Sequence, residues 1–178
     1  MFERFTKAAR GVVKGAAEHA ERSGAASVTP EHLLLALLDR EGTRAAEALG
    51  RLCPAEHRPS LLSALSDARR RAGLSRADSE ALADLGIDVG AIVARVEEVH
   101  GAGALSGDRR DAGWWSGRRT FSREAKTVLE KSLRVALARE DREIGDEHLL
   151  LALTTTGGVV AEALADHGVT YAAVDAAL

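Results

Sequence analysis

Two glutamate–histidine steps are the first residues whose types and spacing suggest chemistry. Glu31-His32 and Glu147-His148 each open an identical string, EHLLLAL. Because carboxylates and imidazoles bind zinc and a glutamate can act as a general base, a metal-dependent hydrolase is one alternative function. Adjacent helical residues point about 100° apart, however, and no third ligand recurs at matching spacing. We therefore predict no metal, no cofactor and no catalytic residue, and we expect both histidines to be buried and bonded to backbone carbonyls.

A second candidate is the glycine-rich segment that contains Trp114 and Trp115. Two Arg-Arg pairs flank the tryptophans, and aspartates are interleaved with them. Indole rings and guanidinium groups can stack on and neutralise single-stranded nucleic acid, so a nucleic-acid binder is the other alternative function. Since the aspartates leave the segment only weakly basic, we predict instead a solvated linker whose indoles pack on the body or contact a protein.

Bulk composition favours an all-α protein without a nucleic-acid or membrane partner. Only 3% of the 178 residues are aromatic, whereas the good helix formers Ala and Leu are abundant. The formal net charge is −3, and no apolar run is long enough to cross a bilayer. Cys53 is the single cysteine, so no intramolecular disulfide can form, and we expect a cytoplasmic location.

The elements that must position the two glutamates come from an internal repeat. Residues 5–37 match residues 121–153 without a gap at an offset of 116, with eleven of 33 positions identical. In each copy, apolar spacings of three and four predict one amphipathic helix, with Thr6 or Ser122 as its N-cap. The EHLLLAL string predicts a second helix, and a third follows around 45–49 and 160–165.

The expected architecture is one domain, 1–178, of two helical repeats related by a pseudo-two-fold axis, with about four helices each. We place repeat one at 1–100, a linker at 101–119 and repeat two at 120–178, with extra helices inserted near 50–82. Within 59–100, one predicted apolar face contains Leu61, Leu62, Leu65 and Ala68, and another contains Ile87, Val89, Ile92, Val93 and Val96. Stacking two such repeats would bury a shared core and leave a groove between them.

Several segments together resemble the double-repeat N-terminal domain of the ClpC and ClpA class of protein unfoldases. They are MFERFT at the start, EHLLLAL in both copies, and LGIDVGAIVARVEEVHG at 85–101. The phosphate-loop pattern of the ATPase modules in those unfoldases, G-x-x-x-x-G-K-[ST], does not occur in this sequence. We therefore expect a free-standing, non-catalytic version of the domain that binds without threading.

The resemblance also implies sites and partners. Glu31 and Glu147 match glutamates that bind phosphoarginine on client proteins, although helix-dipole capping explains an acidic residue there equally well. Phe2, Phe121 and Lys126 match a groove that binds cyclic peptide antibiotics, and the alternative for Phe121 is a buried plug between the repeats. The implied function is a peptide- or degron-binding adaptor, decoy or modulator of a Clp unfoldase and protease. The implied partners are peptides or arginine-phosphorylated clients, Clp components and cyclic peptides.

Overall fold

The computed structural model describes residues 2–71, 73–101, 104–105 and 120–178. Within these ranges the chain forms ten α-helices, one 3-10 turn at Phe2–Arg4 (η1) and two strands of two residues each. The predicted all-α fold is confirmed. Among these residues no single helix is long and apolar enough to span a membrane, and one helix pair that passes by length and composition is bent by 98°.

The first three helices of each repeat correspond one to one. Repeat one contains α1 (Lys7–Arg22), α2 (Pro30–Leu38) and α3 (Arg44–Leu52), and repeat two contains α7 (Arg123–Ala138), α8 (Asp146–Thr155) and α9 (Gly158–Asp166). The predicted hydroxyl N-caps are present: Thr6 Oγ1 accepts from the Ala9 N–H at 3.1 Å, and Ser122 Oγ accepts from the Ala125 N–H at 3.2 Å.

A fourth helix completes each half by packing on the opposite repeat. Helix α4 (Arg58–Arg70) packs on α9, and α10 (Tyr171–Ala177) packs on α3. In α4 the buried residues are Leu61, Leu65 and Ala68, as the apolar spacing predicts, whereas Leu62 is exposed. The two repeats therefore share helices as well as a core.

The backbone hydrogen bonds between the repeats also occur in two equivalent pairs. Strand β1 (Ser27–Val28) pairs in parallel with β2 (Thr120–Phe121), and an isolated parallel bridge joins Phe5 to Ile144. The Val28 carbonyl accepts from the Ser122 N–H at 2.9 Å, and the Ile144 carbonyl accepts from the Thr6 N–H at 3.0 Å. Both pairs of partners are related by the offset of 116, so each repeat supplies the strand that the other needs.

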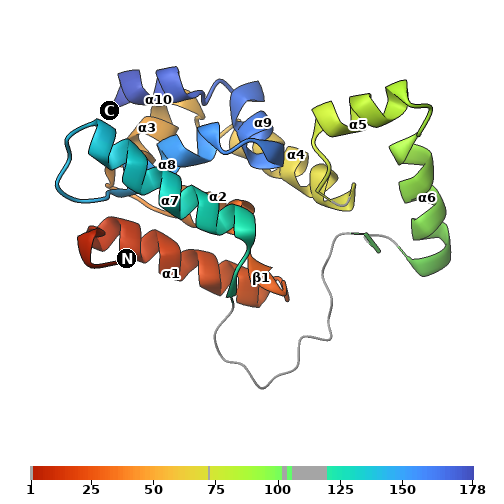
Figure 1. Ribbon diagram of the computed structural model, residues 1–178, viewed down its shortest axis with the longest axis horizontal. Coiled ribbons are helices and arrows are strands. Elements are labelled where there is room, and N and C mark those ends of the chain that lie inside the picture. Colours follow the sequence, from red (N-terminus) through yellow and green to blue (C-terminus); the bar gives the residue numbers. More distant parts are fainter. Residues whose placement is uncertain (1, 72, 102–103, 106–119) are drawn as a thin grey trace.

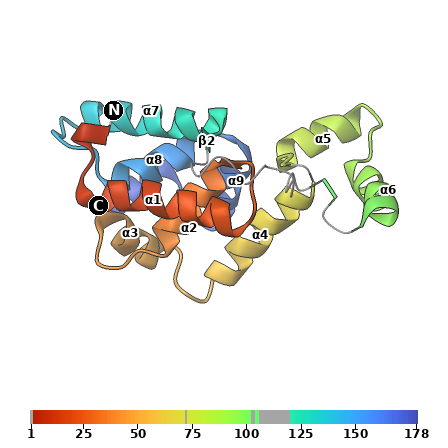
Figure 2. The same cartoon turned by 90° about the horizontal axis from the view of Figure 1, so that it is seen from below.

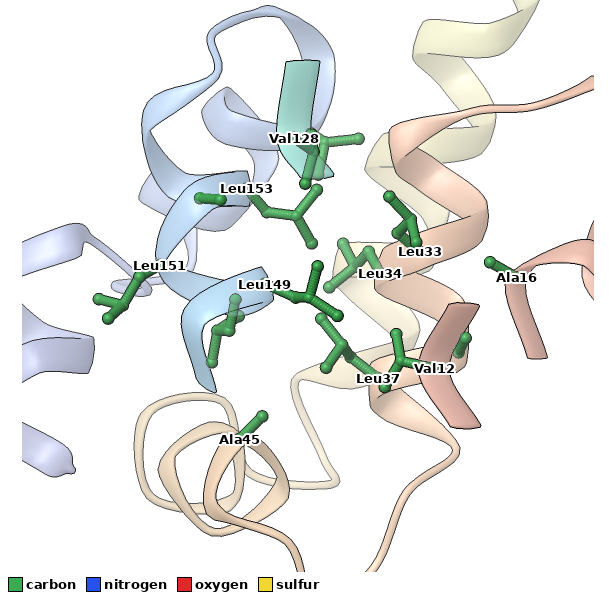
Figure 3. Packing of buried hydrophobic residues seen from close by; sticks show 14 of the residues in the cluster. Val12, Ala16, Leu33, Leu34, Leu37, Ala45, Val128, Leu149, Leu151 and Leu153 are labelled. Carbon is green, nitrogen blue, oxygen red and sulfur yellow. The ribbon is translucent and has the colours of Figure 1, made fainter. Parts of the chain in front are cut away.

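The core lies where α2 of one repeat meets α8 of the other. Figure 3 shows Leu34 and Leu37 of α2 pointing toward Leu149 and Leu153 of α8, and all four side chains are buried. Full burial of one leucine contributes roughly 1.5–3 kcal/mol, so the repeated EHLLLAL string supplies much of the stability. Apart from Phe5, the buried core consists mainly of Leu, Val and Ala side chains.

Helices α5 (Arg76–Asp84) and α6 (Val89–His100) project from this body, as Figures 1 and 2 both show. No residue of α5 is buried, and Val93 is the one buried residue of α6. Of the predicted apolar face, Val93 is buried and Val89 and Val96 are half-buried, whereas Ile87 and Ile92 are exposed. The periodicity correctly indicated an amphipathic helix, but α6 does not pack on the main core.

The sequence of α5 and α6 repeats that of α9 and α10, a match that the sequence analysis missed. The string EALAD occurs at 80–84 and again at 162–166, and a glycine follows two positions later in both. Gly86 and Gly168 have φ values of 81° and 77°, which a glycine adopts without strain as it ends a helix. The chain thus holds an additional half-repeat whose apolar residues Ile87, Ile92 and Val99 are exposed.

Candidate functional site

Two cavities surround the two glutamates that the sequence singled out. The Glu31 pocket, of about 730 Å³, lies between the start of α2, the start of α7 and the turn before α9, with α4 at one side. The Glu147 pocket, of about 470 Å³, lies between the start of α8, the start of α1 and the turn before α3. Each pocket therefore combines elements of both repeats, and the pseudo-two-fold relation exchanges the two.

In the Glu31 pocket, the glutamate is paired with an arginine of the same chain. Arg69, on α4, contacts Glu31 through two nitrogens, with Nε at 3.3 Å from Oε2 and Nη2 bonded to Oε1. The remaining charged residues that line the pocket are Arg123 and Glu124. A hydrogen bond from its own backbone N–H, and a second from Ser122, lower the pKa of Glu124, which is therefore anionic at neutral pH. The charges that line this pocket balance.

In the Glu147 pocket, the glutamate is more deeply buried and its pairing is weaker. Glu147 is 5% exposed, and its Oε1 lies 3.0 Å from Nη1 of Arg44, a residue at the start of α3. The carboxylate folds back over Gly145, where any larger side chain would overlap it. Thr29 stands at the equivalent position in repeat one, so Glu31 cannot take the same path. The two glutamates thus occupy equivalent positions but face different partners.

Asp146 distinguishes the Glu147 pocket further, because repeat one has Pro30 at that position. The residue is 2% exposed and lines the cavity. Its Oδ2 atom has no hydrogen-bond partner among the described residues. Buried carboxylate oxygens are normally hydrogen-bonded, so an unpaired one requires an explanation.

The two histidines have structural roles, but their partners differ from the prediction. Nδ1 of His148 accepts from the Gly145 N–H at 2.9 Å, and Nδ1 of His32 accepts from the Thr29 N–H at 3.0 Å. Each ring therefore caps its helix start by bonding a backbone N–H, and the expected bond to a backbone carbonyl is wrong. Both rings are buried, as predicted.

The second nitrogen of each ring is also engaged. Nε2 lies 2.9 Å from Asp141 Oδ2 in His148 and 3.2 Å from Ser23 Oγ in His32. No group of three His, Cys, Asp or Glu side chains placed to hold a metal ion occurs in the described part of the chain. The Glu-His steps are thus accounted for by helix capping.

Of the predicted peptide groove, Phe121 and Lys126 line neither of the two cavities described above. Phe121 is half-buried and packs against the core, while Lys126 is exposed on α7. Only the backbone of Phe2 belongs to the described part of the chain. A cavity of about 420 Å³ does lie between η1 and α7, but its described lining includes neither Phe121 nor Lys126. Leu129, Leu133 and Leu137 supply its apolar side.

Sequence reasoning missed the arginine partners, although two signals point to them. Arg69 continues the buried stripe of Leu61 and Leu65 at a spacing of four, which directs it inward. Arg44 follows the N-cap Thr43, where a cation opposes the helix dipole, so a nearby anion is expected. Trp114, Trp115 and their arginines lie outside the described residues.

The two equivalent sets of helices, each with a glutamate at the start of its second helix, place the chain in a class of all-α proteins built from two repeats. The family described as the Clp repeat N-terminal domain matches residues 4–71 and 120–178. The chain belongs to this family, as the resemblance predicted. Residues 72–119, with α5 and α6, lie outside both matched segments.

Several solved structures share the fold of this chain. One is the N-terminal domain of the protease-associated chaperone ClpD from Arabidopsis thaliana, with 21% identity, 99% of this chain and 93% of that chain covered, and a TM-score of 0.55. Another is the Hsp104 N-terminal domain from Candida albicans, with 19% identity and a TM-score of 0.51; the match covers 98% of this chain and 89% of that chain. A chain from a malarial protein secretion system matches with 15% identity and a TM-score of 0.58; the match covers 97% of this chain and 90% of that chain.

Proposed function

We propose that this protein is a non-catalytic module that binds peptides or degrons for a Clp unfoldase and protease, as an adaptor, decoy or modulator. The observation that carries the proposal is that each glutamate already holds a guanidinium group inside a cavity. A cavity of this kind can accept the arginine of a client in place of the internal one. The ligand we assign is an arginine-bearing peptide, phosphoarginine included, bound through Glu31 and Glu147.

Calorimetric titration of a phosphoarginine peptide against the purified protein tests the proposal. Glu31→Ala should weaken binding of this peptide, and Glu147→Ala should weaken binding of its unphosphorylated form titrated in the same way, since each removes the acceptor for a guanidinium. Glu18→Ala is the matched control, because Glu18 is an exposed glutamate on α1 that lines neither pocket. Unchanged affinity in both pocket variants would exclude these glutamates as the site.

The cavity between η1 and α7 supports a second ligand class, hydrophobic cyclic peptides. Three leucines along one face of α7 provide an apolar wall, and Glu130 and Arg134 lie at its border. Leu133→Glu should abolish binding of a hydrophobic cyclic peptide while leaving the phosphoarginine affinity unchanged. Loss of both affinities would instead indicate that the variant had disturbed the fold, which a thermal melt would reveal.

The hydrolase alternative makes a different prediction. A metal-dependent enzyme purified without chelator would carry stoichiometric zinc. The capping role of both histidines argues against it, because both of their ring nitrogens already have partners within the protein. Metal analysis by mass spectrometry tests this alternative: stoichiometric zinc would favour the hydrolase, and its absence would favour the binding module.

A further inference from the structure

The two pockets differ in charge. The Glu147 pocket is lined by four carboxylates, Asp141, Glu143, Asp146 and Glu147, against two guanidinium groups, Arg44 and Arg142. The Glu31 pocket is lined by two carboxylates and two guanidinium groups. The Glu147 pocket therefore has an excess of negative charge that the Glu31 pocket lacks, and it should attract a cation and repel a phosphate.

Asp146 provides an unsatisfied acceptor in that pocket. Its carboxylate is almost completely buried, lines the cavity and leaves Oδ2 without a hydrogen-bond partner among the residues that the structure describes. The dipole of α8 favours an acidic residue at this position, but it provides no donor for Oδ2. A buried acceptor of this kind is satisfied when a ligand brings the donor.

The neighbouring Arg44–Glu147 contact indicates which donor fits. A guanidinium group has five N–H donors in a planar fork, so one group can bond two adjacent carboxylates. Arg44 uses one nitrogen on Glu147, and Oδ2 of Asp146 has no hydrogen-bond partner among the described residues. Phosphorylation would add a charge of about −1.5 to −2 beside Asp146, which opposes binding.

We infer that the Glu147 pocket binds an unphosphorylated arginine side chain through Asp146 and Glu147, whereas the Glu31 pocket is the one that tolerates phosphoarginine. This inference rests on the proposed function, because it divides the two ligand forms between its two pockets. The protein would then bind both unphosphorylated and phosphorylated arginine side chains of one client, each in a different pocket. Asp146 is the specificity-determining residue of the division.

Amide chemical shifts of the 15N-labelled full chain can test this assignment. The probes are a capped Gly-Arg-Gly peptide, its phosphoarginine form, and capped Gly-Ala-Gly as a blank. Gly145 reports on the Glu147 pocket, and Gly157 and Gly158 report on the Glu31 pocket. We expect the unphosphorylated peptide to shift Gly145, and we expect Asp146→Asn to weaken that binding about tenfold, the loss of one charge-assisted hydrogen bond.

The phosphoarginine peptide should behave in the opposite way. It should shift Gly157 and Gly158, and it should gain affinity for the Glu147 pocket in Asp146→Asn, a near-isosteric change whose fold is checked by the unperturbed part of the spectrum. Equal binding of the unphosphorylated peptide to the wild type and to Asp146→Asn would overturn the inference. Binding of phosphoarginine with equal affinity at both wild-type pockets would overturn it too, while leaving the proposed function intact. Binding of neither peptide at either pocket would overturn both.

Discussion

Nη1 of Arg44 lies 3.0 Å from Oε1 of Glu147, although 103 positions separate the two residues in the chain. The arginine is 55% exposed at its side chain, whereas the glutamate is buried. The Arg44 side chain therefore extends from the solvent-exposed surface to the buried Glu147 carboxylate at the start of α8. Arg69 approaches Glu31 in the same way from α4. Under the proposed function, each internal arginine occupies the position that a client arginine would take.

Removing the internal arginine should strengthen ligand binding, because the competitor is lost. For Arg69→Met, which keeps the apolar part of the side chain, we expect the phosphoarginine affinity of the Glu31 pocket to rise about five- to tenfold, or roughly 1–1.4 kcal/mol. Calorimetry measures the change. Arg70→Met is the control, since Arg70 pairs with Glu97 on α6 rather than with a pocket residue. A weaker affinity in Arg69→Met would mean that Arg69 contacts the ligand instead of competing with it.

The buried histidine cap of α8 should contribute measurably to stability. His148→Ala removes the acceptor of the Gly145 N–H and leaves space at the end of the core, so the free energy of unfolding should fall by about 2 kcal/mol. Urea denaturation measures this loss. His100→Ala, at the exposed end of α6, should change stability by less than about 0.5 kcal/mol. Equal effects of the two substitutions would contradict the capping role.

The exposed half-repeat should tolerate a charge that its buried counterpart does not. Ile92 of α6 and Val174 of α10 occupy equivalent positions six residues after the matched glycines, but Ile92 is 50% exposed and Val174 is fully buried. Val174→Glu should destabilise the protein by about 3 kcal/mol or more, because a carboxylate is placed in the core. Ile92→Glu should cost less than about 0.5 kcal/mol. Thermal melts of the pair measure the difference, and a large loss in Ile92→Glu would show that α6 packs on the body in solution.

The single thiol should be unreactive in the folded protein. Cys53 is fully buried, and burial raises the pKa of its thiol more than the charge of Arg58 lowers it. Since the thiolate is the reactive form and reagents cannot reach it, alkylation by iodoacetamide at pH 8 should be slow until denaturant is added. Mass spectrometry follows the modification. Rapid labelling without denaturant would place the C-terminal end of α3 in an open conformation.

The repeat and its helices could be predicted from the sequence, because the signals are local. The match of 5–37 to 121–153, the hydroxyl caps at Thr6 and Ser122, and the leucine string all depend on neighbouring residues. The family follows from the same segments, and it is confirmed. The partners of the glutamates could not be predicted, because Arg69 and Arg44 approach from 38 and 103 positions away.

Burial was harder to infer than helicity. The apolar stripe of α6 predicts a helix with one apolar face, but periodicity does not tell what covers that face. Asp146 presents the opposite case: an acidic residue in a first helical turn is usually solvated, yet here the turns of both repeats enclose it. Only tertiary contacts reveal either environment.

The exchanged bridges, Phe5 with Ile144 and Val28 with Phe121, have a consequence for how the two halves are related. One half on its own would present two unfilled backbone edges, and a second identical half would fill both of them. The chain therefore corresponds to a symmetric dimer whose subunits have been joined end to end. Joining frees the halves from having to remain identical, and Pro30 and Asp146 mark one place where they have diverged.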